Sequence, residues 1–227
     1  MARLVRASKP AVRRRGRPRR LSRAQIVEAA LEILANYPAD QLTMARVAKV
    51  VGAVPMALYR HVENRDDLMD AVLQTVMAGL ALEIPAGASW EEGVARWMQG
   101  VRGHFLRYPG ALQTLARSGR TSPAWLEALA LLARVLERAG FYGDALVSAL
   151  IAVSRTTMGW IVQEIAWPLS GEADALATGL GGVSREARDA LAPLFPALAR
   201  LDDDASFRIA VDQVLAPLRG LACMDTH

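Results

Sequence analysis

Residues 42–68 read LTMARVAKVVGAVPMALYRHVENRDDL, and this stretch decides the fold of the N-terminal part of the chain. Thr43 can cap a short helix, and Gly52 permits the positive φ that a sharp turn requires. Pro55 suits the first turn of a following helix, because its missing N–H costs no hydrogen bond there. The stretch therefore predicts a helix, a tight turn and a second helix that ends near His61.

Helix signals continue on both sides of this stretch. Upstream, Ser22 and Gln25 form a capping box, in which each side chain can accept the free backbone N–H of the other residue. Downstream, Asn64 can cap a longer helix that we expect to reach about residue 83. Three short helices and a longer one therefore fill residues 21–83.

The rest of the chain also has helical periodicity, without the alternation that is typical of strands. Further helices are expected at 89–108, 110–117, 123–140, 144–167, 184–194 and 204–221. Residues 168–184 are rich in Gly and Ala and contain a Pro, so we expect a loop there. The predicted fold class is all-α, with about nine to ten helices.

The composition agrees with a helical protein that works in a reducing compartment. Of 227 residues, 52% are hydrophobic and only 6% are aromatic, and Ala and Leu are frequent. Cys223 is the only cysteine, so no disulfide can form within the chain, and we expect a cytoplasmic protein. No apolar run approaches the roughly 18 residues that cross a bilayer, so we expect no membrane contact.

The sequence offers little that is typical of enzymes. It has no paired Cys and His at metal-ligand spacing, no Gly-rich phosphate loop and no Gly-x-Ser-x-Gly motif. We therefore expect no catalytic residues, no cofactor and no metal site.

Residues 42–52 and 54–61 predict the helix-turn-helix arrangement, in which the first helix braces and the second lies in the major groove of DNA. The segments 42–48, 51–53, 58–62 and 64–68 resemble the N-terminal domain of the TetR (tetracycline-repressor-like) family, whose Leu-Tyr-x-His-Val-x-Asn signature stands at residues 58–64. A weaker resemblance to the ligand-binding domain of the tetracycline-repressor subgroup runs through Trp90, Tyr108, Pro109, Gly140, Phe141, Gly159 and Glu164. Together these resemblances cover residues 21–167.

The resemblance implies DNA-binding roles by position. Contacts to the DNA backbone are implied for Thr43, Met44, Tyr59, His61 and Arg65, and contacts near base edges for Pro55, Met56 and Ala57. Because these last three side chains cannot form bidentate hydrogen bonds, base discrimination rests more on Arg60, Arg46 and DNA shape. Tyr59 could alternatively be a half-buried packing residue, and His61 a capping or core histidine.

Residues 1–20 form a basic arm with nine basic residues and no acidic one, whereas the rest of the chain carries a net charge of −5. The run around Arg15, Arg17 and Arg19 contains Arg-Gly-Arg-Pro and resembles an AT-hook, an arm that lies in the narrow minor groove of A·T-rich DNA. The alternative is a solvated tail that binds phosphates without specificity. Both interpretations predict that DNA affinity falls with salt.

The resemblance divides the chain into a disordered arm (1–20), a three-helix helix-turn-helix domain (21–68) and, after a connecting helix, a larger helical ligand-binding and dimerisation domain (69–227). Broad apolar faces on the predicted helices 144–167 and 204–221 could form a four-helix dimer interface, or could bury against their own chain. The candidate ligand-binding residues are Trp97, Phe105, Trp125, Thr157, Met158, Trp160, Gln163 and Glu164, although each aromatic ring could instead be core.

Tetracycline repressors hold a drug-bound magnesium ion through a histidine in the region that matches Thr114 and Leu115, and this chain has none there. We therefore expect an apolar or aromatic effector of another kind. The predicted function is a homodimeric repressor that a small molecule releases from a palindromic operator in double-stranded DNA. Alternatives are a helical ligand-carrier or enzyme-like domain with an incidental basic tail, and a nonspecific architectural DNA protein.

Overall fold

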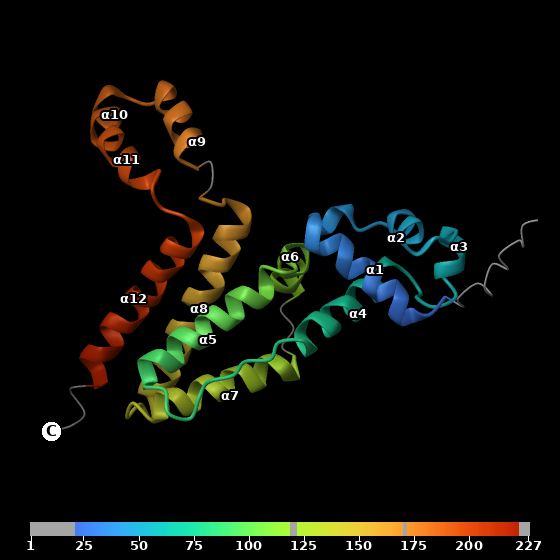
Figure 1. Cartoon of the computed structure of the whole chain (residues 1–227), viewed down its shortest axis with the longest axis horizontal. Helices are drawn as coiled ribbons and strands as arrows, with labels where there is room; N and C mark the ends of the chain where they lie inside the picture. Colours follow the sequence, from blue (N-terminus) through green and yellow to red (C-terminus); the bar gives the residue numbers. More distant parts are fainter. Residues whose placement is uncertain (1–20, 119–121, 170–171, 223–227) are drawn as a thin grey trace, which may run out of the picture.

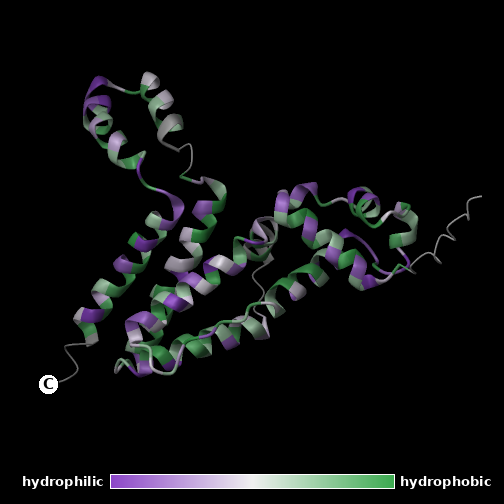
Figure 2. Cartoon of the chain, viewed as in Figure 1, coloured by the Kyte–Doolittle hydropathy of each residue, from purple (hydrophilic) through white to green (hydrophobic). Residues whose placement is uncertain are grey.

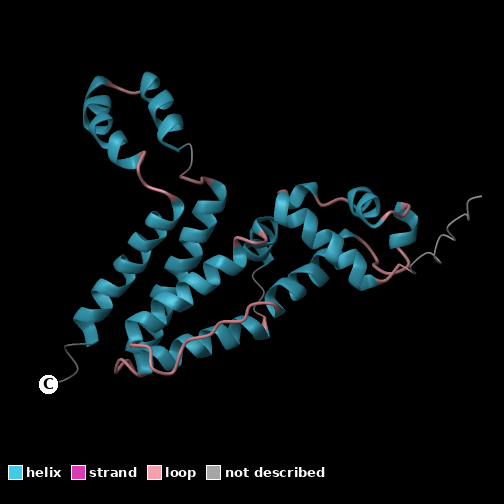
Figure 3. Cartoon of the chain, viewed as in Figure 1, coloured by secondary structure: helices cyan, strands magenta, loops and turns pink. Residues whose placement is uncertain are grey.

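The computed structural model describes residues 21–118, 122–169 and 172–222, and within these ranges every regular element is helical (Figures 1 and 3). The α-helices are α1 (Arg23–Asn36), α2 (Met44–Val51), α3 (Pro55–Leu58), α4 (Arg65–Ala78), α5 (Trp90–Phe105), α6 (Pro109–Ser118), α7 (Pro123–Glu137), α8 (Gly143–Ala166), α9 (Glu172–Gly179), α10 (Arg185–Leu191), α11 (Phe195–Leu198) and α12 (Asp203–Ala222). Short 3₁₀ turns lie at Ala39–Gln41, Leu180–Gly182 and Ala192–Leu194. The all-α fold class is confirmed, and the basic arm lies outside the described residues.

Local capping signals fix most helix starts where the sequence predicts them. Ser22 and Ser89 each form a capping box with the residue three positions on. Thr43 caps α2 by accepting the backbone N–H of Arg46, and Asn64 caps α4. Gly52 has φ +70°, the left-handed conformation that the turn between α2 and α3 requires.

Several expected boundaries are wrong by about three residues or more. The third helix ends at Leu58 rather than His61, because the backbone turns there through hydrogen bonds from His61 and Val62 to Leu58. The connecting helix stops at Ala78 rather than near residue 83. Residues 168–184, expected to be a loop, contain α9, because the Ala-rich run after Glu172 sustains a helix despite the neighbouring Gly and Pro. With α11 as well, the described residues form more helices than the expected nine to ten.

The helices form a head, α1 to α3, and a body, α5 to α12, and α4 connects the two (Figure 1). In the head, α1 packs against α2 and α4. In the body, α5 and α7 pack on each other and on α8, and α12 lies along α8. Buried residues follow α4 along its whole length, from Leu68 to Met77, and α4 packs against α1 in the head and against α6 and α7 in the body. One helix is therefore shared by both cores.

Ion pairs and a buried hydrogen bond hold the body helices in register. The Arg102 guanidinium on α5 binds both carboxylate oxygens of Glu164 on α8, at 2.8 and 2.7 Å, and Asp204 on α12 at 2.7 Å. These carboxylates raise the pKa of Arg102, mainly through the Glu164 hydrogen bonds. The indole N–H of the fully buried Trp97 donates to the Ala128 carbonyl on α7 at 2.7 Å. Helices distant in sequence are thereby joined through defined polar contacts.

The segment from α9 to α11 projects away from the body, at the upper left of Figure 1. Within residues 175–201 no residue is buried, and apolar side chains line an open cavity of about 400 Å³ among α9, α10 and α11. This segment has no closed core of its own.

Helix α8 is long and apolar enough, by length and composition, to cross a membrane. The expectation that no apolar run approaches that length is therefore wrong. Figure 2 shows hydrophobic residues along α8, and only 22% of its most apolar window is buried inside the chain. The α8 surface that α5, α7 and α12 leave open is thus largely apolar, with Arg155 exposed near its middle.

The contact between α1 and α6 gives a test of this packing. A Cβ added at Gly110 would lie 2.6 Å from the Tyr37 carbonyl oxygen and 2.9 Å from the Leu34 side chain, so the two helices would have to separate. We expect Gly110→Ala to lower the free energy of unfolding by about 1–3 kcal/mol in urea titrations. Gly103→Ala on α5 is the control, because a Cβ there meets nothing within 4 Å. Equal stability of the two variants would contradict the described packing.

Candidate nucleic-acid interface and effector site

Buried side chains anchor α2 and α3 in the core of the head. Val47 on α2 and Leu58 on α3 are fully buried, and Ala48 is 1% exposed. The outer side of the same unit is unusually apolar for a surface, with Met56 73% exposed and Tyr59 47% exposed. The short α3 therefore presents large apolar side chains to the exterior.

The residues predicted to contact DNA divide into two groups by exposure. The exposed ones are Thr43, Pro55, Met56, Tyr59, Arg60 and Arg65, and the half-buried ones are Met44, Arg46, Ala57 and His61. The structure thus gathers them on α2, on α3 and at the start of α4. Arg15, Arg17 and Arg19 lie outside the described residues. Contact of each with DNA stays a prediction.

Two of the predicted DNA-binding arginines also brace the head. Arg65 donates from Nε to the Leu42 carbonyl at 2.8 Å and from Nη2 to the Ala39 carbonyl at 2.7 Å. Arg46 donates to the Gln41 side chain at 2.6 Å, and its guanidinium lies 3.7 Å from the centre of the Tyr37 ring. Only part of each guanidinium is therefore free for phosphates.

A salt bridge that the sequence analysis missed joins the start of α1 to the start of α4 and to the turn that follows α3. Arg23 binds both carboxylate oxygens of Asp67, at 3.0 and 2.6 Å, and donates to the His61 carbonyl at 2.8 Å. Asp67 also accepts the backbone N–H of Glu63 at 2.9 Å. The Arg23 hydrogen bonds, followed by that of Glu63, lower the pKa of Asp67 to about 2. No local sequence pattern pairs residues that stand 44 positions apart.

Residues 26–72 match the family model described as bacterial regulatory proteins, tetR family. An HTH-type transcriptional regulator of Saccharopolyspora erythraea is 31% identical over 199 residues, which cover 84% of this chain and 84% of that protein. The chain belongs to the TetR family. The tetracycline repressor protein class A from transposon 1721 of Escherichia coli is 30% identical and is matched over 85% of its length.

Solved structures agree with this assignment. TetR from Acinetobacter baumannii AYE, 25% identical, has a TM-score of 0.66 over 89% of this chain and 98% of its own. Apo ActR from Streptomyces coelicolor, 23% identical, shares the fold with a TM-score of 0.69 over 92% of this chain and 99% of its own. The resemblance found in the sequence is confirmed, and the chain is a DNA-binding transcriptional regulator of the TetR family.

The structure divides the residues predicted to bind an effector between the core and a pocket. Trp97, Phe105 and Thr157 are at most 1% exposed, and the Thr157 hydroxyl donates to the Val153 carbonyl. Trp125 packs on Trp97 with ring centres 5.8 Å apart. These residues lie in the core of this TetR-family body, and their contact with a ligand stays a prediction.

The remaining candidates lie toward the end of α8. Trp160, Gln163 and Glu164 line a cavity of about 330 Å³, which also contacts Trp167, Leu169, Leu198, Leu201, Asp203, Ser206 and Ile209. Met158 is half-buried beside the core and does not line this cavity. Glu164 is already engaged by Arg102, which limits its role as a free polar handle.

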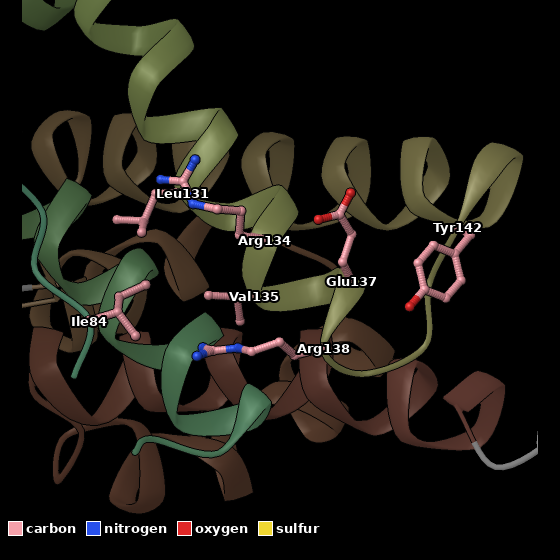
Figure 4. Close-up of a pocket in the computed structure, with 7 residues that line it drawn as sticks. All are labelled: Ile84, Leu131, Arg134, Val135, Glu137, Arg138 and Tyr142. Atoms are coloured by element: carbon pink, nitrogen blue, oxygen red, sulfur yellow. The ribbon is translucent and has the colours of Figure 1, made fainter. Parts of the chain in front are cut away.

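A second cavity, which the sequence analysis did not single out, lies on the side of the body formed by α7. It measures about 510 Å³ and is lined by Ile84, Leu131, Arg134, Val135, Glu137, Arg138 and Tyr142 (Figure 4). Four of these residues, Arg134, Glu137, Arg138 and Tyr142, are exposed, so this is an open surface groove. Among the residues predicted to bind an effector, none lines it.

The Asp67 salt bridge gives a pH-dependent prediction. Because the folded pKa of Asp67 lies below its ordinary value of 3.8, its contribution to stability is complete above pH 4 and disappears as the pH falls through about 2. We expect Asp67→Asn to lower the melting temperature by a few degrees between pH 5 and 7.5, and the difference from wild type to shrink below pH 4.

Circular dichroism melts measure this effect. Asp66→Asn is the matched control, because the neighbouring Asp66 is largely exposed and its nearest arginine contact is 3.9 Å long. If the melting temperature of Asp67→Asn at neutral pH equals that of wild type, the salt bridge does not stabilise the head.

Proposed function

We propose that this TetR-family chain is a ligand-responsive repressor that binds a palindromic operator as a homodimer and is released by a small molecule. The observation that carries the proposal is the outer surface of α3, where Met56 and Tyr59 stand out beside the buried Leu58. Water offers the apolar surface of these side chains no favourable contact, whereas a DNA groove offers thymine methyl groups, and a phosphate can accept a hydrogen bond from the Tyr59 hydroxyl.

The proposed DNA contacts follow from exposure and chemistry. We propose that Pro55, Met56, Ala57, Arg60 and Arg46 lie near base edges, and that Thr43, Met44, Tyr59, His61 and Arg65 contact the DNA backbone. Because the tip of α3 carries no group that can form bidentate hydrogen bonds, sequence-dependent DNA shape contributes to specificity. The basic arm, residues 1–20, adds phosphate or minor-groove contacts around Arg15, Arg17 and Arg19.

Dimerisation is supported by the apolar surface of α8. Val147, Ile151 and Val162 are about half exposed, and at 100° per residue they lie within roughly 60° of one another around the helix axis. Such a stripe, next to α12, is suited to a four-helix interface with a second copy. The projecting α9–α11 segment, which has no buried residue between 175 and 201, gains a covered surface in the same assembly.

The cavity beside Trp160, Gln163 and Glu164 is the proposed effector site. Its two tryptophans, Trp160 and Trp167, offer flat apolar surface to an aromatic molecule, and Gln163 offers a polar contact. Several curated relatives are named tetracycline repressors, but the region at Thr114 and Leu115 has no histidine for a drug-bound magnesium ion. We therefore propose an apolar or aromatic effector of another class.

The remaining parts of the proposal concern organisation and place. We propose a basic arm (1–20), a DNA-binding domain (21–68) and an effector and dimerisation domain (69–227), with no catalytic centre. The partner of such a protein is chromosomal DNA, and we therefore propose that it acts in the cytoplasm.

Footprinting on the DNA that flanks its own gene tests the proposal. We expect a protected palindrome whose half-sites are centred about 34–36 Å apart, one helical turn or a multiple of it. Loss of the Tyr59 hydroxyl in Tyr59→Phe should weaken operator binding about tenfold, the cost of one hydrogen bond to a charged phosphate.

The matched control is Tyr142→Phe, which removes the hydroxyl of another exposed tyrosine, at the corner between α7 and α8. Fluorescence anisotropy with the labelled operator should give wild-type affinity for this variant. If footprinting shows no preferred site on any flanking DNA, the proposal of a specific operator is wrong.

The dimer has its own test. A charge placed in the apolar stripe of α8 by Ile151→Asp should leave a monomer at micromolar concentration, because the carboxylate would have to be desolvated in the interface. Sedimentation velocity measures the change. Leu126→Asp, at another exposed apolar position on α7, should remain dimeric. A dimeric Ile151→Asp protein would place the interface elsewhere.

A further inference from the structure

The last turn of α5 carries a buried histidine that contacts the connecting helix. His104 is 4% exposed, and its Nε2 lies 2.8 Å from the carbonyl oxygen of Val76 in the last turn of α4. Its Nδ1 lies 3.0 Å from Nη2 of Arg107, at the corner between α5 and α6. The ring therefore joins α4 to the segment that leads into α6.

The partners of the two ring nitrogens fix the protonation state of His104. A carbonyl oxygen only accepts a hydrogen bond, so Nε2 must carry the proton that is donated to Val76. A guanidinium only donates, so Nδ1 must offer its lone pair to Arg107. Both contacts are made only by the neutral ring with the proton on Nε2.

The ring sits where the head is connected to the body. Helix α4 carries the head at one end and packs against α6 and α7 at the other, and α6 packs in turn against α1. Phe105 and Tyr108 surround the ring, with ring centres 5.4 and 6.2 Å from that of His104. A tilt of α4 relative to α5 would break the bond to Val76.

We propose that neutral His104 is a positioning residue that holds α4 at one angle to the body and thereby sets the spacing of the two DNA-binding heads. The proposal rests on the dimeric, operator-binding function proposed above. When the hydrogen bond to Val76 is broken, α4 samples several angles, and only a fraction of dimers keeps the spacing that fits successive major grooves. Apparent operator affinity falls in proportion to that fraction.

Acid breaks the other contact of the ring, the hydrogen bond that Nδ1 accepts from Arg107. Protonation leaves the Nε2–H donor for Val76 intact, but the loss of the Arg107 contact displaces the ring from the position in which it meets Val76. The groups that face the ring are the Val76 carbonyl from α4, and the Arg107 guanidinium and the Tyr108 ring from the α5–α6 corner. Burial, followed by the charge of Arg107, lowers the pKa of His104. The ring is thus neutral at pH 7.5 and gains a proton only below the ordinary histidine value of about 6.5. Nδ1–H and the Arg107 N–H groups then face each other as two donors, and they separate.

Spin-label distance measurements on the full-length dimer read out the head spacing directly. One label per chain is placed by Glu28→Cys on the exposed side of α1, with Cys223→Ser to remove the natural thiol. We expect a narrow head-to-head distribution for wild type at pH 7.5 and a broader one at an acid pH well below 6.5. His104→Ala should be broad at both pH values and bind the footprinted operator roughly threefold to tenfold more weakly at pH 7.5.

Two conservative variants separate positioning from general stability. His104→Gln keeps one N–H and one acceptor and cannot gain a proton, so its distribution should be narrow at both pH values. Arg107→Ala removes the donor that opposes Nδ1–H, so its distribution should stay narrow at the acid pH as well. Arg96→Ala, an exposed arginine on the same helix, is the matched control and should behave as wild type. The other described histidine, His61, lies in the head, and the variant His61→Gln should keep the wild-type pH response of the head spacing.

Each outcome decides the proposal. A wild-type distribution for His104→Ala, or an acid response that persists in His104→Gln, overturns it. If His104→Ala does not fold, the His104→Gln and Arg107→Ala variants test the proposal instead. Nitrogen NMR of the His104 ring is the second measurement, and a proton on Nδ1 at pH 7.5 overturns the proposal. A monomer, or a dimer without a preferred operator, would instead refute the proposed function. A dimer that binds its operator with unchanged head spacing in every variant would refute only the role of His104.

Discussion

The structure depends on one constraint: α4 belongs to two cores at once. Its buried residues run from Leu68, in the half that packs on α1, to Met77, in the half that packs on the body. Because protein interiors are close-packed, neither core can yield by small continuous deformation. A signal that passes through α4 from body to head must therefore be a change between discrete orientations of this rigid helix.

Polar contacts at both ends of α4 determine which orientation is held. At the head end, Arg65 donates to two carbonyls before α2, and Asp67 binds Arg23 at the start of α1. At the body end, His104 donates to Val76. The Arg65 guanidinium, which is proposed to contact phosphates, thus also stiffens the head. The proposed DNA contact and the orientation of α4 therefore depend on the same side chain.

The sequence predicted what is encoded locally. Capping boxes at Ser22 and Ser89 and the glycine turn at Gly52 depend on neighbours a few positions away, and the structure confirms them. The family signature predicted which residues lie on the outer face of α3. The contacts of Arg102 could not be predicted, because its partners stand 62 and 102 positions away and only packing brings them together. Core and pocket aromatics are likewise indistinguishable by periodicity, since both lie on apolar helix faces.

The open face of α8 distinguishes a protein partner from a lipid one. By length and composition α8 could span a bilayer. Arg155, however, stands at its midpoint and is exposed, where a charge in the bilayer centre costs about 2.5–3.5 kcal/mol on insertion scales. At the edge of a helix bundle the same side chain can reach water while its aliphatic stem covers apolar surface. The neighbouring helix α12 also begins with charged residues, among them Asp204, which forms a salt bridge with Arg102. In a bilayer these charges would lose their contact with water. The proposed second copy of the chain would therefore cover this face at lower free energy than a membrane would.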